Sequence, residues 1–262
     1  MTKITLALLV IYAPLLLYVF FFQDKLLFFP DKRPFSDCSW IEQKGGQIIW
    51  DKKYNARYYF QEKPQAKATL VHFHGNAGGA CDRIIILDKL DDQPINVVLV
   101  EYPGYAGNTD QKGEKAFLEN AESVLKSLKS QNPEVPFILY GESLGTGIAT
   151  YLASTQEVKG VILQSPYPSL GEVGQFHYPF LPVKLIIKNN FPLKKWAEKV
   201  KAPVLIMHGQ NDDIIPYSLG QKASTFFKSP LRFETLKDRG HNDLLDHDKM
   251  WSVVKSFLKD VL

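Results

Sequence analysis

The chain has 262 residues, of which 45% are hydrophobic and 23% charged, with a formal net charge of +3. This length suffices for one α/β domain with a sizeable core. Because the net charge is small and no basic patch interleaves with aromatic residues, we expect no nucleic-acid partner. Zinc-type Cys/His spacing is missing from the sequence, so neither a metal nor a cofactor is expected. Two cysteines, Cys38 and Cys81, are too few for a disulfide framework, and the sequence leaves open whether they pair.

The N-terminus carries the first strong signal. Ile4 to Phe22 is a run of 19 residues without a charge. As a helix it would span about 28 Å, close to the hydrocarbon thickness of a bilayer. We predict a single-pass transmembrane anchor over residues 1–25, followed by a folded domain over residues 26–262. The alternative is a cleaved signal peptide, but its apolar core would be shorter and no A-x-A site follows. The flanking charges are too few to predict which side of the membrane the domain occupies.

After residue 26, short apolar strands alternate with helical patterns. An antiparallel hairpin is expected at Gln47–Trp50 and Ala56–Gln61. Six further strands are predicted at Thr69–His74, Val97–Val100, Phe137–Tyr140, Val161–Gln164, Val204–His208 and Leu231–Thr235. Helices are predicted near Gly79–Leu90, Gly113–Ser130, Leu144–Ser154, Tyr217–Phe227 and Asp246–Leu258. This alternation predicts an α/β fold with a mostly parallel eight-stranded sheet, covered by helices on both faces.

The strand at Thr69–His74 runs into a loop of small residues, His74 to Gly79. Such a loop can supply a backbone N–H to a developing oxyanion, and Asn76 is the candidate donor. His74 precedes the candidate nucleophile described next, so the expected chain order argues against it as a base. We expect His74 to brace the loop through hydrogen bonds instead.

Residues 141–145, Gly-Glu-Ser-Leu-Gly, fit the G-x-S-x-G nucleophile elbow. A predicted strand precedes them and a small-residue helix follows, which is the context that the motif requires. The turn is so tight that Gly141 and Gly145 must be nearly free of side chains. Ser143 would then stand at a helix start, where free N–H groups stabilise negative charge, and the Leu144 N–H would be the second oxyanion donor. The alternative is a glycine-rich strand–helix turn with an incidental serine.

Residues 165–200 interrupt the alternation between the strand ending near Gln164 and the strand starting near Pro203. Five prolines break this segment into short pieces, and aromatic and aliphatic side chains make it apolar. We interpret residues 165–200 as a small cap. Its apolar side chains either line an acyl pocket or fill a core beneath a surface excursion.

A nucleophilic serine needs a base and an acid, which on this fold follow in the order Ser, Asp/Glu, His. Asp212 comes just after an apolar strand and a glycine, so it is well placed to orient an imidazole. We prefer it to Asp213, whose alternative role is a turn or helix cap. His241 lies in a turn-rich loop before the last helix and is the candidate base. The other later histidines are not favoured, since they precede the acid, lie in a strand or lie on the final helix: His177, His208 and His247.

The motifs together resemble those of the α/β-hydrolase superfamily, and more closely those of the membrane-anchored Bem46-like hydrolases and the related ABHD depalmitoylases. The resemblance spans about residues 26–258 and rests on the stretches His74–Gly78, Glu101–Gly107, Tyr140–Gly147, His177–Pro182, Pro203–Gly209 and Gly240–Asp243. One departure is Asn108, where relatives more often have serine. It touches a structural turn and no candidate catalytic residue.

This resemblance implies a membrane-anchored serine hydrolase with Ser143 as nucleophile, His241 as base and acid, and Asp212 as the orienting carboxylate. It also implies an acyl ester or thioester as substrate, cleaved by a depalmitoylase-like enzyme or a lipid esterase, and the lipid bilayer as partner. The alternatives are a peptidase of the serine aminopeptidase type and a non-catalytic scaffold of the same fold. The sequence gives neither the acyl length nor the leaving group nor the oligomeric state.

Overall fold

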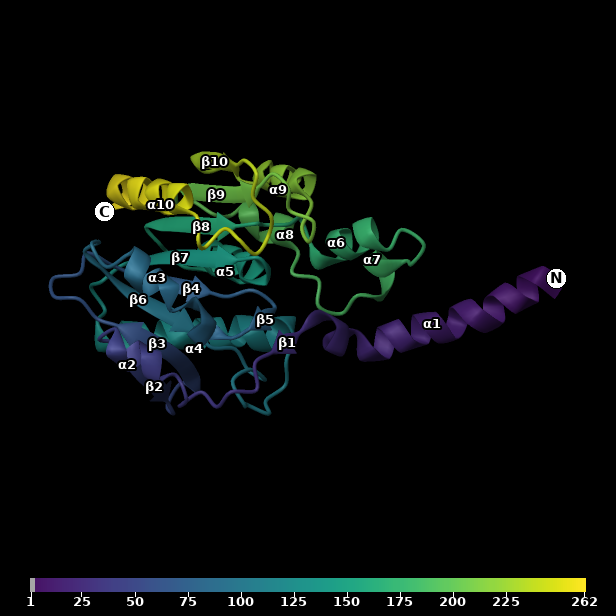
Figure 1. The fold of residues 1–262 in the computed structure, drawn as a ribbon, viewed down its shortest axis with the longest axis horizontal. Coiled ribbons are helices and arrows are strands. Elements are labelled where there is room, and N and C mark those ends of the chain that lie inside the picture. Colours follow the sequence, from purple (N-terminus) through teal and green to yellow (C-terminus); the bar gives the residue numbers. More distant parts are fainter. Residues whose placement is uncertain (1–2) are drawn as a thin grey trace.

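An eight-stranded β-sheet forms the centre of the molecule (Figure 1). The structure, a computed structural model, describes residues 3–262, with side chains from Tyr12 onward. The strands of this sheet are β2 (Gln47–Asp51), β3 (Ala56–Gln61), β4 (Ala68–Phe73), β6 (Ile95–Val100), β7 (Phe137–Glu142), β8 (Gly160–Gln164), β9 (Val204–Gly209) and β10 (Leu231–Leu236). Their order is β10-β9-β8-β7-β4-β6-β3-β2. Of these eight, β3 is antiparallel to both of its neighbours, so the sheet is mixed but mostly parallel.

The predicted strands are all present, each with ends within two residues of the prediction. Three predicted helices differ. The one at Gly79–Leu90 is a 3₁₀ turn, Ala80–Arg83, followed by a short α3, Ile85–Lys89, because the Asp82 carboxylate accepts the Gly79 N–H and tightens the turn. The one at Tyr217–Phe227 is α9 and ends at Ser224. The one at Asp246–Leu258 is α10, which begins at Asp248 and ends at Val261.

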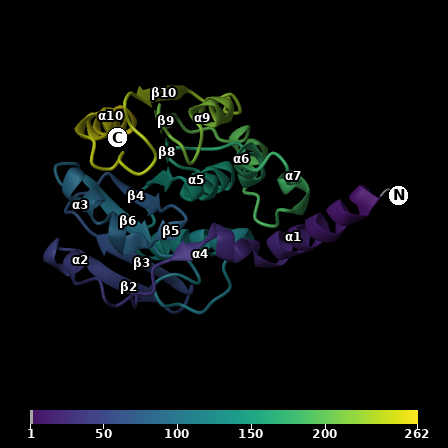
Figure 2. The ribbon, with the colours of Figure 1, turned by 45° about the vertical axis from the view of Figure 1, so that its right-hand side comes forward.

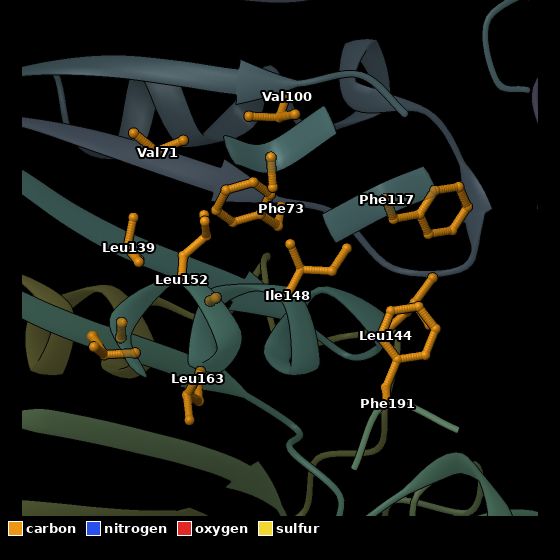
Figure 3. Close-up of a cluster of buried hydrophobic side chains, with 14 of the residues drawn as sticks. Val71, Phe73, Val100, Phe117, Leu139, Leu144, Ile148, Leu152, Leu163 and Phe191 are labelled. Atoms are coloured by element: carbon orange, nitrogen blue, oxygen red, sulfur yellow. The ribbon is translucent and has the colours of Figure 1, made fainter. Parts of the chain in front are cut away.

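Helices cover both faces of the sheet, as the alternation predicts. On one face pack α4 (Glu114–Gln131), α5 (Leu144–Thr155), α8 (Leu193–Ala197) and α9, and on the other α3 and α10 (Asp248–Val261). Figure 3 shows the first core, where Val71, Phe73, Leu139 and Leu163 of the strands meet Ile148 and Leu152 of α5. Each fully buried side chain of this size stabilises the fold by roughly 1.5–3 kcal/mol. The core therefore holds α5, and with it the residue just before α5, in a fixed position.

Helix α1 (Lys3–Leu27) projects from the body of the domain, and its C-terminal half runs beside the cap (Figures 1 and 2). Residues 165–200, the segment predicted to be a cap and called the cap from here on, contain α6 (Leu170–His177), α7 (Val183–Ile186) and α8. Side chains of residues 4–11, which belong to the predicted membrane span, lie outside the described part. Within the residues that are described, none of the helices combines the length and apolar character needed to cross a membrane. Helix α1 ends at Leu27, two residues after the predicted end of the anchor at residue 25.

Two short connections join the N-terminal segment to the domain. Strand β1 (Phe29–Pro30), directly after α1, pairs in parallel with β5 (Ala77–Gly78), just after the candidate oxyanion residue. Cys38 and Cys81 form a disulfide with a Cα–Cα distance of 6.0 Å. The question that the sequence leaves open is thus answered, and the chain between α1 and β2 is held against the 3₁₀ turn.

Candidate active site

The predicted site residues come from loops at one edge of the sheet. Ser143 follows β7, Asp212 follows β9, His241 follows β10, and Asn76 follows β4. Neighbouring parallel strands end at the same edge, so their following loops lie close together, as at the ligand-binding edge of other open α/β sheets. The fold therefore gathers residues that are up to 165 positions apart in the sequence.

The turn between β7 and α5 holds Ser143 in a strained backbone conformation, with φ 50° and ψ −115°. A side chain on Gly141 would place Cβ 2.4 Å from the Gly145 carbonyl oxygen, and one on Gly145 would place it 2.0 Å from the Phe73 carbonyl oxygen. Both distances are far below contact, so both positions require glycine. A non-glycine residue at positive φ costs about 1–3 kcal/mol, which the surrounding core must offset.

Ser143, His241 and Asp212 form a hydrogen-bonded chain. His241 Nε2 lies 2.9 Å from Ser143 Oγ, and His241 Nδ1 lies 2.7 Å from Asp212 Oδ2. Only 8% of Ser143 and 6% of Asp212 is exposed, so little water competes for these bonds. With Asp212 ionised, Nδ1–H donates to its carboxylate and Nε2 is left to accept the serine hydroxyl.

The environment of Asp212 keeps its carboxylate ionised. Burial by itself raises the pKa of Asp212, but hydrogen bonds from His208 and His241 reverse the effect and hold the pKa well below its usual range. The other oxygen, Oδ1, accepts the backbone N–H of Ile214 at 3.1 Å and of Ile215 at 2.7 Å. A carboxylate with this many donors has a fixed orientation as well as a fixed charge.

Sequence reasoning missed two partners of this carboxylate. Ser165 Oγ donates to Asp212 Oδ2 at 2.9 Å, and His208 Nε2 lies 3.3 Å from the same oxygen. Ser165 directly follows β8, the strand between those of the nucleophile and the acid, and that position was the available signal. Asp213, the alternative acid, forms no bond to His241 among the described residues and is exposed to the cavity instead.

The two candidate oxyanion donors border the same cavity as Ser143. Leu144 is the first residue of α5, so its N–H has no acceptor within the helix. For the Asn76 N–H, the described part of the chain offers no hydrogen-bond acceptor. Asn76 is held in place by its side chain, whose Nδ2 donates to the Leu27 carbonyl of α1 at 2.9 Å. Among the described residues, no group of Cys, His, Asp or Glu side chains is arranged to hold a metal ion.

Buried histidine and tyrosine side chains brace the oxyanion loop. His74 Nδ1 lies 2.7 Å from the Gly75 carbonyl, and Nε2 lies 3.3 Å from Glu101 Oε1. The Tyr102 hydroxyl donates to the His74 carbonyl at 2.8 Å. These are the contacts of a bracing residue, as the sequence predicts for His74.

A partly buried ion pair supports the elbow. Arg83 donates to both oxygens of Glu142, at 2.8 and 2.6 Å. Burial raises the pKa of Glu142, but the charge and hydrogen bonds of Arg83 prevail and lower the pKa to about 2. This pair, which the sequence did not predict, ties the 3₁₀ turn to the residue immediately before Ser143.

A cavity of about 850 Å³ opens above Ser143, near the upper end of the usual range for ligand pockets. Its lining is mostly aliphatic and aromatic, and most of it comes from α1, the cap and the loop after Asp212. From the cap it includes Leu170, Val173, Tyr178, Phe180, Leu181, Val183, Ile186 and Ile187. The site can therefore surround an apolar chain attached to a group at Ser143.

Comparisons with known proteins agree with this architecture. Residues 64–186 match the family model for serine aminopeptidase S33. An uncharacterized protein of Mycobacterium tuberculosis (strain CDC 1551 / Oshkosh) is 30% identical, covering 91% of this chain and 88% of its own length. The lysophosphatidylserine lipase ABHD12 of Danio rerio is 27% identical over 64% of this chain, which spans about half of that relative (49%). An esterase of Pyrococcus furiosus superposes with a TM-score of 0.68 at 17% identity, covering 82% of this chain and 90% of its own.

Fold and comparisons together define an α/β-hydrolase. The chain belongs to the α/β-hydrolase superfamily and is an ABHD-type member of it.

Proposed function

We propose that the protein is a membrane-anchored serine hydrolase that cleaves carboxylic esters or thioesters carrying an acyl chain. The observation that supports this most strongly is the hydrogen-bonded chain of Ser143, His241 and Asp212 directly beneath a large apolar cavity. A nucleophile with a base and an orienting acid is the arrangement that acyl transfer needs.

The first half of the reaction forms an acyl-enzyme. Ser143 Oγ attacks the carbonyl carbon while His241 Nε2 takes the hydroxyl proton. The resulting oxyanion accepts hydrogen bonds from the N–H groups of Leu144 and Asn76. His241 then gives its proton to the leaving alcohol or thiol as the carbonyl–heteroatom bond breaks, and the ionised Asp212 stabilises the imidazolium throughout.

The second half hydrolyses the acyl-enzyme. A water molecule attacks the acyl carbonyl, its proton passes to His241, and the oxyanion forms in the same place. The tetrahedral species collapses, the proton returns to Ser143 and the carboxylic acid leaves. One water molecule is consumed overall: its oxygen enters the carboxylic acid, and one of its protons restores the Ser143 hydroxyl, whose proton left with the alcohol or thiol.

The apolar lining of the cavity favours an acyl substrate over a peptide. The serine aminopeptidase name of the family model keeps a peptidase as the alternative. A free amino terminus needs a carboxylate to bind it, and of the described cavity lining Asp213 is the sole acidic side chain, whereas most of the rest is aliphatic or aromatic. The names of the similar proteins, esterase and lysophosphatidylserine lipase, point the same way.

We also propose that α1 anchors the enzyme in a membrane. The uncharged run Ile4 to Phe22 motivates this, and several apolar side chains of the described part of α1 are exposed, with Leu17 56% and Phe21 67% accessible. Disulfides persist in oxidising compartments, so the bond between Cys38 and Cys81 favours a domain on the oxidising side of that membrane. A membrane-impermeant protease that cuts the domain in intact cells would support this side, whereas cleavage only after lysis would contradict it.

A substrate panel tests the proposal. Wild type and Ser143→Ala would be compared on p-nitrophenyl esters, acyl thioesters and aminoacyl naphthylamides, with thermal unfolding used to show that both are folded. We expect wild type to hydrolyse the esters or thioesters and Ser143→Ala to lose that activity. Faster turnover of the naphthylamides would favour the peptidase, and absence of turnover on the whole panel would favour the non-catalytic scaffold.

A further inference from the structure

Helix α1 carries a stripe of residues that face the candidate active site. Leu15, Val19 and Gln23 follow one another at intervals of four, which places them on one face of a helix. All three line the cavity that contains Ser143. Leu17 and Phe21, between them in sequence, do not line this cavity and are largely exposed. The helix therefore has one apolar face toward the site and another directed outward.

Gln23 is the polar member of this stripe and fixes α1 to the cap. It is only 6% exposed, and its Nε2 donates to the Ile186 carbonyl at 3.1 Å while its Oε1 accepts the Lys188 N–H at 2.7 Å. At the next residue of α1, Asp24 Oδ1 accepts a hydrogen bond from Asn189 Nδ2 at 2.7 Å. A buried amide costs free energy unless it is hydrogen-bonded. The bonds of Gln23 to the cap therefore stabilise the packing of α1 against the cap.

The inner end of α1 is also attached to the candidate oxyanion loop. The Leu27 carbonyl accepts the Asn76 side-chain N–H, and β1 continues directly into the pairing with β5. The cavity wall formed by α1 thus begins beside Asn76 and extends outward as far as Leu15. Leu15 and Leu27 are twelve residues apart, or about 18 Å along a helix axis.

We propose that α1 is one wall of the acyl-binding channel and determines which chain lengths the enzyme accepts. The acyl chain of the substrate lies between the Leu15–Val19–Gln23 stripe and the cap, with its carbonyl at Ser143 and its methyl end toward Leu15. The preferred substrate is a long-chain acyl amphiphile whose tail runs along the anchor helix. This inference rests on the proposed esterase function. It gives α1 a role in substrate specificity in addition to anchoring.

Binding can be tested without catalysis. Full-length Ser143→Ala protein in nanodiscs would be titrated with a fluorescent long-chain fatty acid as the probe. Adding Val19→Trp should fill the channel midway and raise the dissociation constant about tenfold or more. The matched control is Leu17→Trp, which puts the same bulk on the outward face and should change the constant less than about twofold. Equal effects of the two tryptophans, or none from either, would overturn the inference.

Chain-length preference gives a second, graded readout with Ser143 intact. Val19→Trp should lower the ratio of kcat/KM for a long-chain ester to that for a short-chain ester by about tenfold, since the short chain does not reach it. Leu15→Trp, nearer the outer end, should affect only the longest chains, and it also serves if Val19→Trp does not fold. A flat profile for both variants contradicts the inference. Probe binding that is lost with Val19→Trp in a protein without any esterase activity would uphold the channel and contradict the proposed reaction.

Discussion

Replacing Asp212 by asparagine is expected to abolish most of the activity while leaving the site nearly unchanged in shape. In the wild type, Asp212 Oδ1 accepts the N–H groups of Ile214 and Ile215 at 3.1 and 2.7 Å. The carbonyl oxygen of an asparagine can accept the same two N–H groups. Its amide nitrogen then faces His241 Nδ1, where the carboxylate oxygen lies at 2.7 Å. An amide donates at this position, so Nδ1 must become the acceptor and Nε2 must carry the proton. An imidazole in that tautomer cannot accept the Ser143 proton.

The magnitude follows from this change of tautomer. A trypsin-type triad loses about 10⁴ in kcat on the same substitution, and we expect Asp212→Asn to lower kcat by about 10³–10⁴. That loss equals about 4–5.5 kcal/mol of transition-state stabilisation. The assay is steady-state hydrolysis of a short p-nitrophenyl ester, so that binding in the acyl channel does not mask the chemical step.

Asp213→Asn is the matched control, because it makes the same chemical change one residue away without contact to His241 in the described structure. We expect less than about a fivefold effect on kcat, as for other residues outside the reacting chain. If Asp213→Asn lowered kcat more than Asp212→Asn did, the assignment of the acid would be refuted. If Asp212→Asn lowered the free energy of unfolding by several kcal/mol, the substitution would be disturbing the fold and not only the tautomer of His241.

Three further predictions concern stability and are measured by chemical or thermal unfolding. Because the folded-state pKa of Glu142 is lowered to about 2 from 4.5, its ion pair stabilises the fold fully above pH 4.5 and is lost as the pH falls toward 2; this contributes about 3 kcal/mol, and Glu142→Gln should remove that pH dependence. Cys38→Ser should lower the free energy of unfolding by about 4 kcal/mol, as reduction of the Cys38–Cys81 bond should in wild type; an unchanged value under reducing conditions would contradict the pairing. Gly145→Ala should destabilise by about 3 kcal/mol because its Cβ would meet a backbone oxygen at 2.0 Å, whereas Gly240→Ala, with its nearest neighbour at 3.7 Å, should cost little.

Features that depend on local pattern could be predicted from the sequence. The eight strands are recognisable by apolar runs bounded by turn residues, and the elbow by two glycines that the strand–helix turn requires sterically. The candidates Asp212 and His241 follow from the same logic, because each comes just after a strand that ends at the catalytic edge. The structure brings His241 within hydrogen-bond distance of both Asp212 and Ser143.

Features that depend on contacts between distant segments could not be predicted. Ser165 reaches Asp212 across 47 positions, and Arg83 reaches Glu142 across 59. Neither pair has a fixed spacing, so a single sequence does not specify either contact, although the position of Ser165 directly after β8 places it at the same edge of the sheet. The pairing of Cys38 with Cys81 is of the same kind.

The N-terminal segment shows the limit of this reasoning most clearly. An uncharged run predicts an anchor that is independent of the domain it carries, because composition reports solvent preference and not contacts. Gln23 is merely the first polar residue after that run, yet it accepts a backbone N–H from Lys188, 165 positions away. The role of α1 as a wall of the cavity follows from that contact and its neighbours.

Labelling with a fluorophosphonate probe, followed by peptide mass spectrometry, addresses the nucleophile itself. The probe reacts with a serine hydroxyl only where a base activates it and oxyanion donors stabilise the adduct. Wild type should be labelled on the peptide containing Ser143, and folded Ser143→Ala should not be labelled. Persistent labelling of Ser143→Ala, or a wild-type adduct on another serine such as Ser165, would contradict the proposed mechanism.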